Sequence, residues 1–246
     1  MDNKPVILTA GCSFTKYKWQ CWPNFVKWFE PSSQIINLGK PASCNEAIAR
    51  SVINGVKKYK NVKKVFIMWS APDRYQVVVD KKPETKSNDA TTSLWNMDFN
   101  WHEYFGGHVD SKQHKIYQKH FLNEQQNQIR MLERIIFLQL YLEKHNIDYK
   151  MMCFKGNVID HAPKSKGQAA LWKQINWRKF IFYNKLKGFN EYAEENFPDD
   201  FFKPEDQHPH PIAHYYWVKD IMYKSNTMAP TLELDQLIKF KRICKK

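Results

Sequence analysis

Short runs of apolar residues alternate along the chain with longer segments of helical periodicity. Four of these runs are nearly continuous in apolar character, which is typical of strands that are buried on both faces of a sheet. They cover residues 5–11, 34–39, 63–70 and 148–154. Helical patterns separate them at 23–30, 45–58 and 123–145. This alternation predicts a parallel sheet with helices on both faces.

The longest helical pattern, 123–145, repeats apolar residues at helical spacing. We expect these residues to form one apolar face that packs on the sheet. They are Ile129, Leu132, Ile136, Leu140 and Tyr141.

Two segments interrupt the alternation. Residues 75–115 are polar at first and then aromatic, and a long insertion of this kind is either a lid near the active face or an elaboration that covers a sheet edge. Residues 155–200 predict one or two helices packed through aromatic side chains. No repeat or low-complexity linker divides the chain. We therefore expect residues 1–246 to form a single α/β domain, a three-layer α/β/α sandwich with four or five parallel strands in flavodoxin-like order.

The composition supports a folded protein without a membrane span. Hydrophobic residues make up 43% of the 246 residues and aromatic residues 15%, which excludes a disordered chain. The chain has no long apolar run, and its first residues do not resemble a signal peptide, so we expect a cytoplasmic protein. The five cysteines are odd in number and lack a CxxC pair, which favours reduced thiols over disulfides or structural zinc.

The net charge of +13 indicates attraction to nucleic acid, anionic glycans or acidic proteins. The basic residues are spread along the chain, with local runs only at 57–64 and 239–246. Neither run lies in a motif that reads a nucleic-acid groove. We therefore expect a solvated basic surface and no nucleic-acid partner.

Candidate chemistry lies where the first apolar run ends, in Gly-Cys-Ser-Phe-Thr (11–15). The carboxyl ends of parallel strands are where ligands bind in open sheets. A serine nucleophile at Ser13 needs a base and a carboxylate that orients the base. The distant segment 206–214 contains an imidazole that suits the base, His208, and a carboxylate, Asp206. A small-residue turn that packs strand against helix is the structural alternative. Cys12 is expected to point into the sheet.

These motifs resemble the SGNH (GDSL-type) hydrolases, and especially the serine-hydrolase-like proteins of tailed phages. GCSF resembles the block that carries the nucleophile, and NLGKPASCNEAIAR (37–50) resembles the second block, with Ala42 at its glycine position. DQHP (206–209) resembles the last block. The resemblance implies that Ser13 is the nucleophile, His208 the general base and Asp206 the orienting carboxylate.

The resemblance also implies an oxyanion hole and a function. The backbone N–H groups of Ser13 and Ala42 would be the donors, provided that the backbone at Ala42 needs no positive φ. The third block departs from the family, because Trp69-Ser70-Ala71-Pro72-Asp73-Arg74 replaces Gly-x-Asn-Asp, and the Ser70 hydroxyl would take the place of the asparagine. The implied function is a serine esterase or deacylase without a cofactor, with an ester, by analogy one on an acylated carbohydrate, as substrate.

The missing asparagine keeps a second interpretation open. Loss of one oxyanion donor typically lowers turnover by ~10²–10³. The chain is then a catalytically weak or inactive binding protein, or a structural protein associated with a virion or an anionic surface, found in the host cytoplasm or the virion.

Other side chains near these motifs have two possible roles each. Arg74 is expected to bind a substrate carboxylate or phosphate, or to form an ion pair. Asn45 is expected to cap the helix that follows it, with a polar contact to substrate as the alternative. The histidine cluster suits a metal, but no second cluster supplies further ligands, so we predict no metal. His210 and His214 are expected at the rim of the site and on a helix face.

Overall fold

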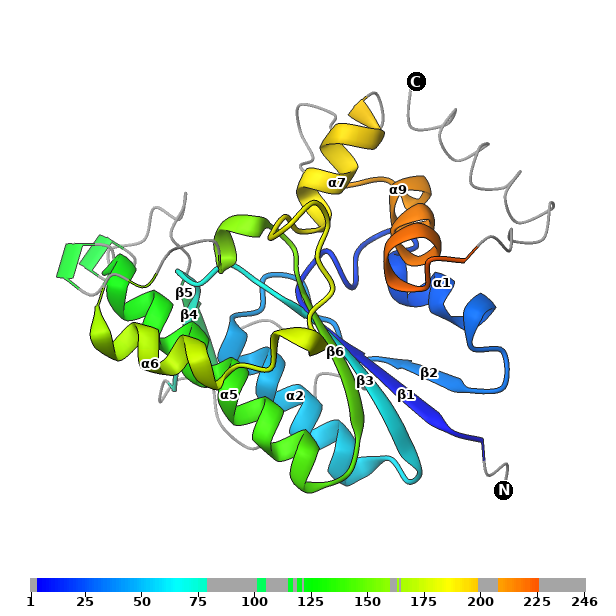
Figure 1. Cartoon of the computed structure of the whole chain (residues 1–246), viewed down its shortest axis with the longest axis horizontal. Helices are drawn as coiled ribbons and strands as arrows, with labels where there is room; N and C mark the ends of the chain where they lie inside the picture. The colour runs from blue at the N-terminus through cyan, green and yellow to red at the C-terminus, as the bar shows by residue number, and fades with distance from the viewer. Residues whose placement is uncertain are drawn as a thin grey trace.

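A computed structural model of the chain describes residues 4–78, 101–104, 115–116, 119–120, 122–159, 163, 165–198 and 208–225. Its central sheet contains four strands, β1 (Val6–Ala10), β2 (Gln34–Asn37), β3 (Val62–Trp69) and β6 (Asp148–Cys153). Their order is β2-β1-β3-β6 and every neighbouring pair is parallel (Figure 1). The predicted parallel sheet in flavodoxin-like order is confirmed, with four strands in the described part of the chain.

Helices cover both faces of this sheet (Figure 1). One face carries α2 (Asn45–Lys58), α5 (Glu124–Lys144) and α6 (Lys166–Gln174), and the other carries α1 (Trp22–Phe29), α7 (Phe189–Asn196) and α9 (Pro211–Tyr216). Helix α9 continues as a π-helical turn, η3 (Trp217–Met222), and two 3₁₀ turns, η1 (Gly156–Val158) and η2 (Trp177–Lys179), follow β6. The predicted three layers are confirmed. The predicted strands and the three predicted helices differ from the observed ones by at most two residues at either end.

Alternate residues of the strands enter two separate cores. On β1, Val6, Leu8 and Ala10 join the core beneath α2 and α5, whereas Ile7 joins the core beneath α1 and α9. Strand side chains point alternately to the two faces of a sheet. This geometry explains why the central strands read as continuous apolar runs, since both of their faces are buried. The strand β2 lies at the edge of the sheet and is more exposed.

The predicted apolar face of α5 is partly wrong. Leu140 is 57% exposed and the neighbouring Phe137 is 50% exposed. Successive helical residues are rotated by about 100°, and the buried stripe lies on the other side of Leu132 from Leu140. The buried apolar residues are Met131, Leu132, Ile135, Ile136, Leu138 and Leu142, so the predictions for Leu132 and Ile136 are confirmed. The apolar residues of α5 extend around more than one face, so spacing alone did not identify the face that packs.

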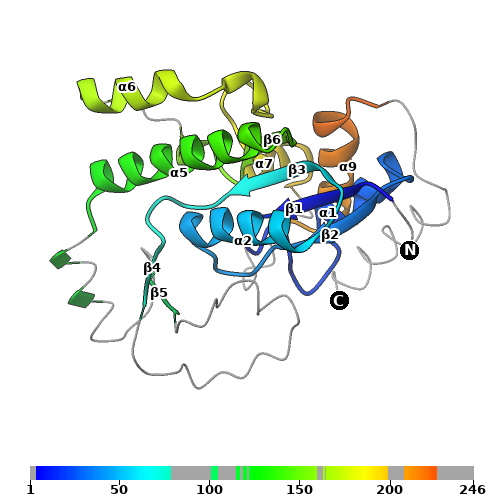
Figure 2. The same ribbon diagram turned by 90° about the horizontal axis from the view of Figure 1, so that it is seen from below.

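A second, two-stranded sheet lies within the predicted insertion. The strands β4 (Tyr75–Val78) and β5 (Trp101–Tyr104) pair antiparallel. Figure 2 shows α2 and α5 side by side, with this small sheet at one end of the pair. Most of segment 75–115 lies outside the described residues, and its role as a lid stays a prediction.

Two further findings concern the described residues. Cys12, Cys21, Cys44 and Cys153 are buried and are not joined by disulfides within the described ranges, while Cys244 lies outside them. None of the helices in the described ranges combines the length and apolar character that a membrane crossing needs.

Candidate active site

The loop after β1 holds Ser13 in a tight turn. Gly11 begins it because a Cβ there would lie 2.1 Å from the Thr15 Oγ1 atom and 2.9 Å from the Met68 carbonyl oxygen. The Cys12 carbonyl then accepts hydrogen bonds from the N–H groups of Thr15 (2.9 Å) and Lys16 (3.1 Å). Ser13 is 7% exposed. The serine is therefore fixed at the carboxyl edge of the sheet, beside the neighbouring strand β3.

The loop after β2 packs directly against this turn. The Lys40 N–H donates to the Gly11 carbonyl at 3.1 Å, and the Asn37 Nδ2 atom donates to the Thr15 carbonyl at 2.9 Å. The Asn37 Oδ1 atom in turn accepts from the Gly39 N–H at 2.8 Å. These bonds bring the second sequence block, with Ala42, to the same edge of the sheet as Ser13.

Ala42 adopts a conformation that glycine favours. Its φ is 67°, in the left-handed region, so the turn does need the positive φ that the predicted oxyanion hole required to be absent; alanine adopts it under strain and still keeps its N–H. Ala42 follows Pro41 in a β-turn that the Ser43 N–H closes on the Lys40 carbonyl at 3.3 Å. A turn of this kind requires a positive φ at the residue after proline. Alanine therefore occupies a turn position at which glycine is usual.

Several donors at this edge are not used by the fold. Neither the N–H groups of Ser13 and Ala42 nor the Ser13 Oγ atom forms a hydrogen bond to any residue that the structure describes. The Ser70 Oγ atom is fully buried and likewise lacks a hydrogen-bond partner among the described residues. Buried polar groups are usually paired, so such atoms mark a place where a ligand can bind.

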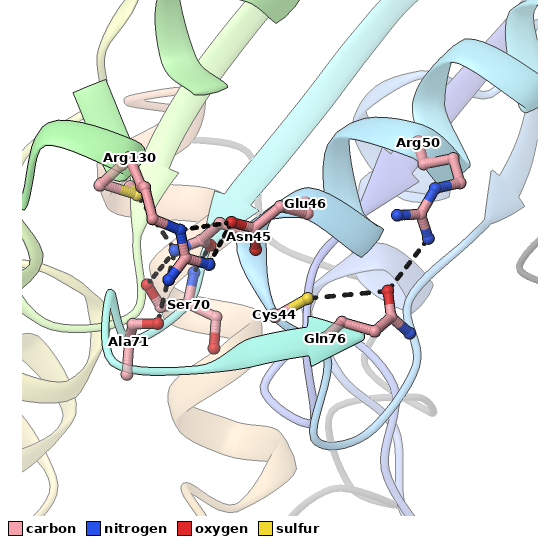
Figure 3. A network of polar contacts seen from close by, with 9 residues as sticks. Cys44, Asn45, Glu46, Arg50, Ser70, Ala71, Gln76 and Arg130 are labelled. Carbon is pink, nitrogen blue, oxygen red and sulfur yellow. Dashed lines mark hydrogen bonds and ion pairs between the residues drawn. The ribbon is translucent and has the colours of Figure 1, made fainter. Parts of the chain in front are cut away.

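Asn45 fixes the backbone where β3 ends (Figure 3). Its Oδ1 atom accepts from the Ser70 N–H at 2.8 Å, and its Nδ2 atom donates to the Ser70 carbonyl at 3.0 Å. The Nδ2 atom also lies 3.4 Å from the Ala71 carbonyl and 3.0 Å from the Met131 sulfur. Cys44, not Asn45, is the N-cap of α2, so that prediction is wrong by one residue. The buried Asn45 amide faces the strand end, and its oxygen and nitrogen atoms both bind the backbone of Ser70 there.

Charged side chains surround this strand end. Arg74 donates to the Ser43 carbonyl at 3.4 Å, which ties the loop after β3 to the loop after β2. Arg130 of α5 forms an ion pair with Glu46 of α2 (Figure 3). The Arg130 guanidinium also lies 4.1 Å from the centre of the Tyr75 ring. Substrate binding by Arg74 and Asn45 stays a prediction.

A further arginine is fixed beneath the small sheet. Arg50 of α2 donates to the Gln76 Oε1 atom at 3.0 Å (Figure 3). Burial lowers the pKa of the Arg50 guanidinium. This contact fastens β4 to α2 near the site.

The C-terminal segment meets the loop that carries Ser13. The His208 ring stacks on Tyr17 with centroids 4.0 Å apart and an interplanar angle of 13°, and it lies 5.2 Å from the Phe14 ring. The Trp19 Nε1 atom donates to the Pro209 carbonyl at 3.0 Å. The fold therefore brings the segments of the two candidate residues Ser13 and His208 together. Asp206 lies outside the described residues.

The other two histidines of this segment are buried. His210 is the N-cap residue of α9 and is only 7% exposed, so the expected rim position is wrong. The His214 Nδ1 atom accepts from the Trp22 N–H at 3.1 Å. Burial, aided by His208 and His210, lowers the pKa of His214 to about 3, so the ring is neutral and serves the core. Among the described residues, no three His, Cys, Asp or Glu side chains are grouped as a metal site requires.

Tyr17 is the contact residue that the sequence patterns missed. The signal for it was the run of aromatic residues that follows GCS, with Phe14, Tyr17 and Trp19 in one short loop.

Comparison with family models gives one match. Residues 10–184 match the family described as "Family of unknown function (DUF6071)". The chain belongs to this family. The matched region includes Ser13, Ala42 and Ser70 and ends before the segment that contains His208. A search of curated proteins found no match.

Solved structures give distant similarities. The psychrotrophic esterase EstA from Pseudoalteromonas sp., inhibited by monoethylphosphonate, is 14% identical with a TM-score of 0.46, and the match covers 91% of this chain and 96% of that one. The protein YXIM of Bacillus subtilis is 10% identical with a TM-score of 0.45, covering 90% of this chain and 55% of that one. A protein assigned as a GDSL-like lipase from Parabacteroides merdae ATCC 43184 is 10% identical with a TM-score of 0.39, covering 88% and 94%.

Proposed function

We propose that this protein is a serine ester hydrolase of the SGNH type, with Ser13 as nucleophile, His208 as general base and Asp206 as the carboxylate that orients it. The observation that carries the proposal is the stacking of the His208 ring on the loop of Ser13, at 4.0 Å from Tyr17. A hydroxyl and an imidazole from opposite ends of the sequence thus belong to one packed unit. Asp206 precedes His208 by two residues in the sequence.

The proposed reaction has two half-reactions. His208 takes the proton of the Ser13 hydroxyl while Oγ forms a bond to the acyl carbon, and the protonated imidazole then gives that proton to the departing alkoxide as the ester bond breaks. Water attacks the acyl-serine in the same manner, His208 accepts its proton, and that proton returns to the Ser13 Oγ atom as the acid leaves.

The negative charge on the acyl oxygen needs donors. The N–H groups of Ser13 and Ala42 and the hydroxyl of Ser70 are the candidates, since none of them is hydrogen-bonded to another described residue. The family resemblance implies an asparagine amide in the third block, and Ser70 would supply a hydroxyl in its place. We expect Ser70→Ala to lower kcat by about 10².

Hydrolysis assays test this function. Wild type and Ser13→Ala are compared on p-nitrophenyl acetate and on an acetylated glycan, the substrate class that the resemblance implies. We expect Ser13→Ala to lose ~10³ or more in rate, because the covalent route is removed. Ser32→Ala, an exposed serine before β2, is the matched control and should retain the wild-type rate. Equal rates for Ser13→Ala and wild type would refute the proposal.

A second candidate is a protein that keeps this fold for binding and has little or no hydrolytic activity, as in a virion-associated structural role. The altered third block and the alanine at the left-handed position 42 favour it. A fluorophosphonate probe separates the two candidates, because rapid labelling at Ser13 requires an activated serine. Labelling of wild type but not of Ser13→Ala supports the hydrolase, and no labelling of either supports the binding protein.

A further inference from the structure

The aromatic residues after Ser13 form a closed set of contacts with His208. Tyr17 stacks on the imidazole at 4.0 Å, and the Trp19 ring meets the Tyr17 ring edge-on at 4.8 Å. Trp19 then donates its Nε1 hydrogen to the carbonyl of Pro209, the residue after His208. The loop therefore holds both the ring of His208 and its adjacent backbone.

We propose that Tyr17 is a positioning residue for His208, which fixes the plane of the imidazole beside Ser13 and stabilises its cationic form. This inference rests on the proposed function. Two stacked rings resist tilting, and the electron-rich face of a phenol ring attracts a cation. His208 becomes an imidazolium when it takes the Ser13 proton, so the contact with Tyr17 strengthens as the reaction proceeds.

Among the titratable groups on the packed elements, the ammonium groups act in the opposite direction. Lys16 and Lys18 lie on the same loop, and the Lys18 ammonium is 5.4 Å from the centre of the Tyr17 ring. His210 and His214 lie at the start of α9, and His208 contributes to the lowered pKa of His214. The proposed partner Asp206 and the face of the Tyr17 ring both favour the imidazolium against this repulsion.

Three variants test the role of Tyr17. Tyr17→Ala removes the stack, Tyr17→Phe keeps a ring with the same shape, and Tyr141→Ala is the matched control. Tyr141 also contacts a histidine, His145, at 4.5 Å between ring centroids, but on α5. NMR titration of the His208 ring and the pH dependence of kcat and KM on p-nitrophenyl acetate are measured for each.

We expect Tyr17→Ala to lower kcat by about tenfold to 10²-fold, because the His208 imidazole is no longer held in position for the chemical step. KM should change little, because the imidazole does not contribute to substrate binding. The titration midpoint of His208 and the acid limb of kcat/KM should both move to lower pH by about half a unit to one unit, because the cationic ring loses a partner. Tyr17→Phe should remain within about twofold of wild type, and Tyr141→Ala should match wild type.

Two results would overturn the role of Tyr17. One is an unchanged His208 midpoint and pH profile in Tyr17→Ala, and the other is equal damage in Tyr17→Phe and Tyr17→Ala. The proposed function fails separately, if Ser13→Ala hydrolyses the ester as fast as wild type. In that case the NMR midpoint still decides whether Tyr17 acts on His208, because it requires no turnover.

Discussion

The loops that follow β1 and β3 leave the same edge of the sheet, and the structure holds them in different ways. The β1 loop combines the hydrogen bonds of its tight turn with ring contacts, with Phe14 and Tyr17 against His208 and Trp19 against His210. The start of the β3 loop is held by hydrogen bonds, with the Asn45 amide bound to the N–H and the carbonyl of Ser70.

The two loops differ in which of their polar atoms form hydrogen bonds within the fold. In the β1 loop, ring packing and the hydrogen bonds of Gly11, Cys12 and Thr15 leave the N–H and the hydroxyl of Ser13 without a hydrogen bond to the described residues. In the β3 loop, the N–H and the carbonyl of Ser70 are both hydrogen-bonded to Asn45, whereas the Ser70 hydroxyl has no hydrogen-bond partner among the described residues. Groups that do not stabilise the fold are available to a ligand, and both loops therefore carry candidate donors for the proposed site.

Removal of the Asn45 amide should have the largest effect of the changes considered next, because it breaks the β3 loop. Asn45→Ala leaves the buried N–H and carbonyl of Ser70 without their partner, which should lower the free energy of unfolding by about 2–4 kcal/mol. Urea denaturation followed by circular dichroism measures this change.

The control for Asn45 is Gln125→Ala, an exposed residue in the first turn of α5. It should change stability by no more than about 0.5 kcal/mol. If Asn45→Ala were as stable as wild type, the view that hydrogen bonds hold the β3 loop would be wrong.

The buried His214, in the segment that packs against the β1 loop, predicts that the free energy of unfolding depends on pH. Its folded pKa of about 3 lies below the ordinary value of 6.5, so the unfolded chain binds a proton in this range that the folded chain does not. His214 therefore contributes stability that is complete above about pH 6.5 and is lost as the pH falls towards 3, by about 1.4 kcal/mol per pH unit.

The variant His214→Asn isolates this contribution. The asparagine Oδ1 atom can still accept from the Trp22 N–H but does not titrate. We expect the stability of wild type, measured by urea denaturation from pH 4 to 6, to rise more steeply with pH than that of the variant, by close to one proton. His145→Asn, at an exposed position, should keep the wild-type slope. Parallel slopes in wild type and His214→Asn would show that His214 is not buried as a neutral ring.

The same two loops show how far the sequence alone leads. The order of strands and helices followed from apolar runs and helical spacing, because burial on both faces of a sheet leaves a direct pattern. That Ser13 and His208 belong together followed from motif resemblance, since residue spacing does not determine which distant loops meet. The sequence patterns do not identify Tyr17 and assign Asn45 to the wrong role, because both roles depend on single tertiary contacts. They place Leu140 on the packed face because a helix can carry more apolar residues than it buries.

Ala42 offers the smallest and most specific test, at the turn that joins the two loops. Alanine at a φ of 67° is strained by about 1–2 kcal/mol, and glycine removes that strain while adding freedom to the unfolded chain. Ala42→Gly should therefore raise stability by up to about 1 kcal/mol, as measured by the urea midpoint. Ala49→Gly, inside α2, should lower it by about 1 kcal/mol or more, because helix propensity and packing are both lost.

The opposite signs of these two changes separate backbone strain from a general effect of glycine. Because glycine keeps the N–H at position 42, Ala42→Gly should also retain the hydrolytic rate to within about threefold if that N–H is an oxyanion donor. A loss of stability in both variants would mean that position 42 has an ordinary backbone. The Ala42 N–H would then lie in a different turn from the one described, and the Ser70 hydroxyl and the Ser13 N–H would remain as the candidate donors to the acyl oxygen.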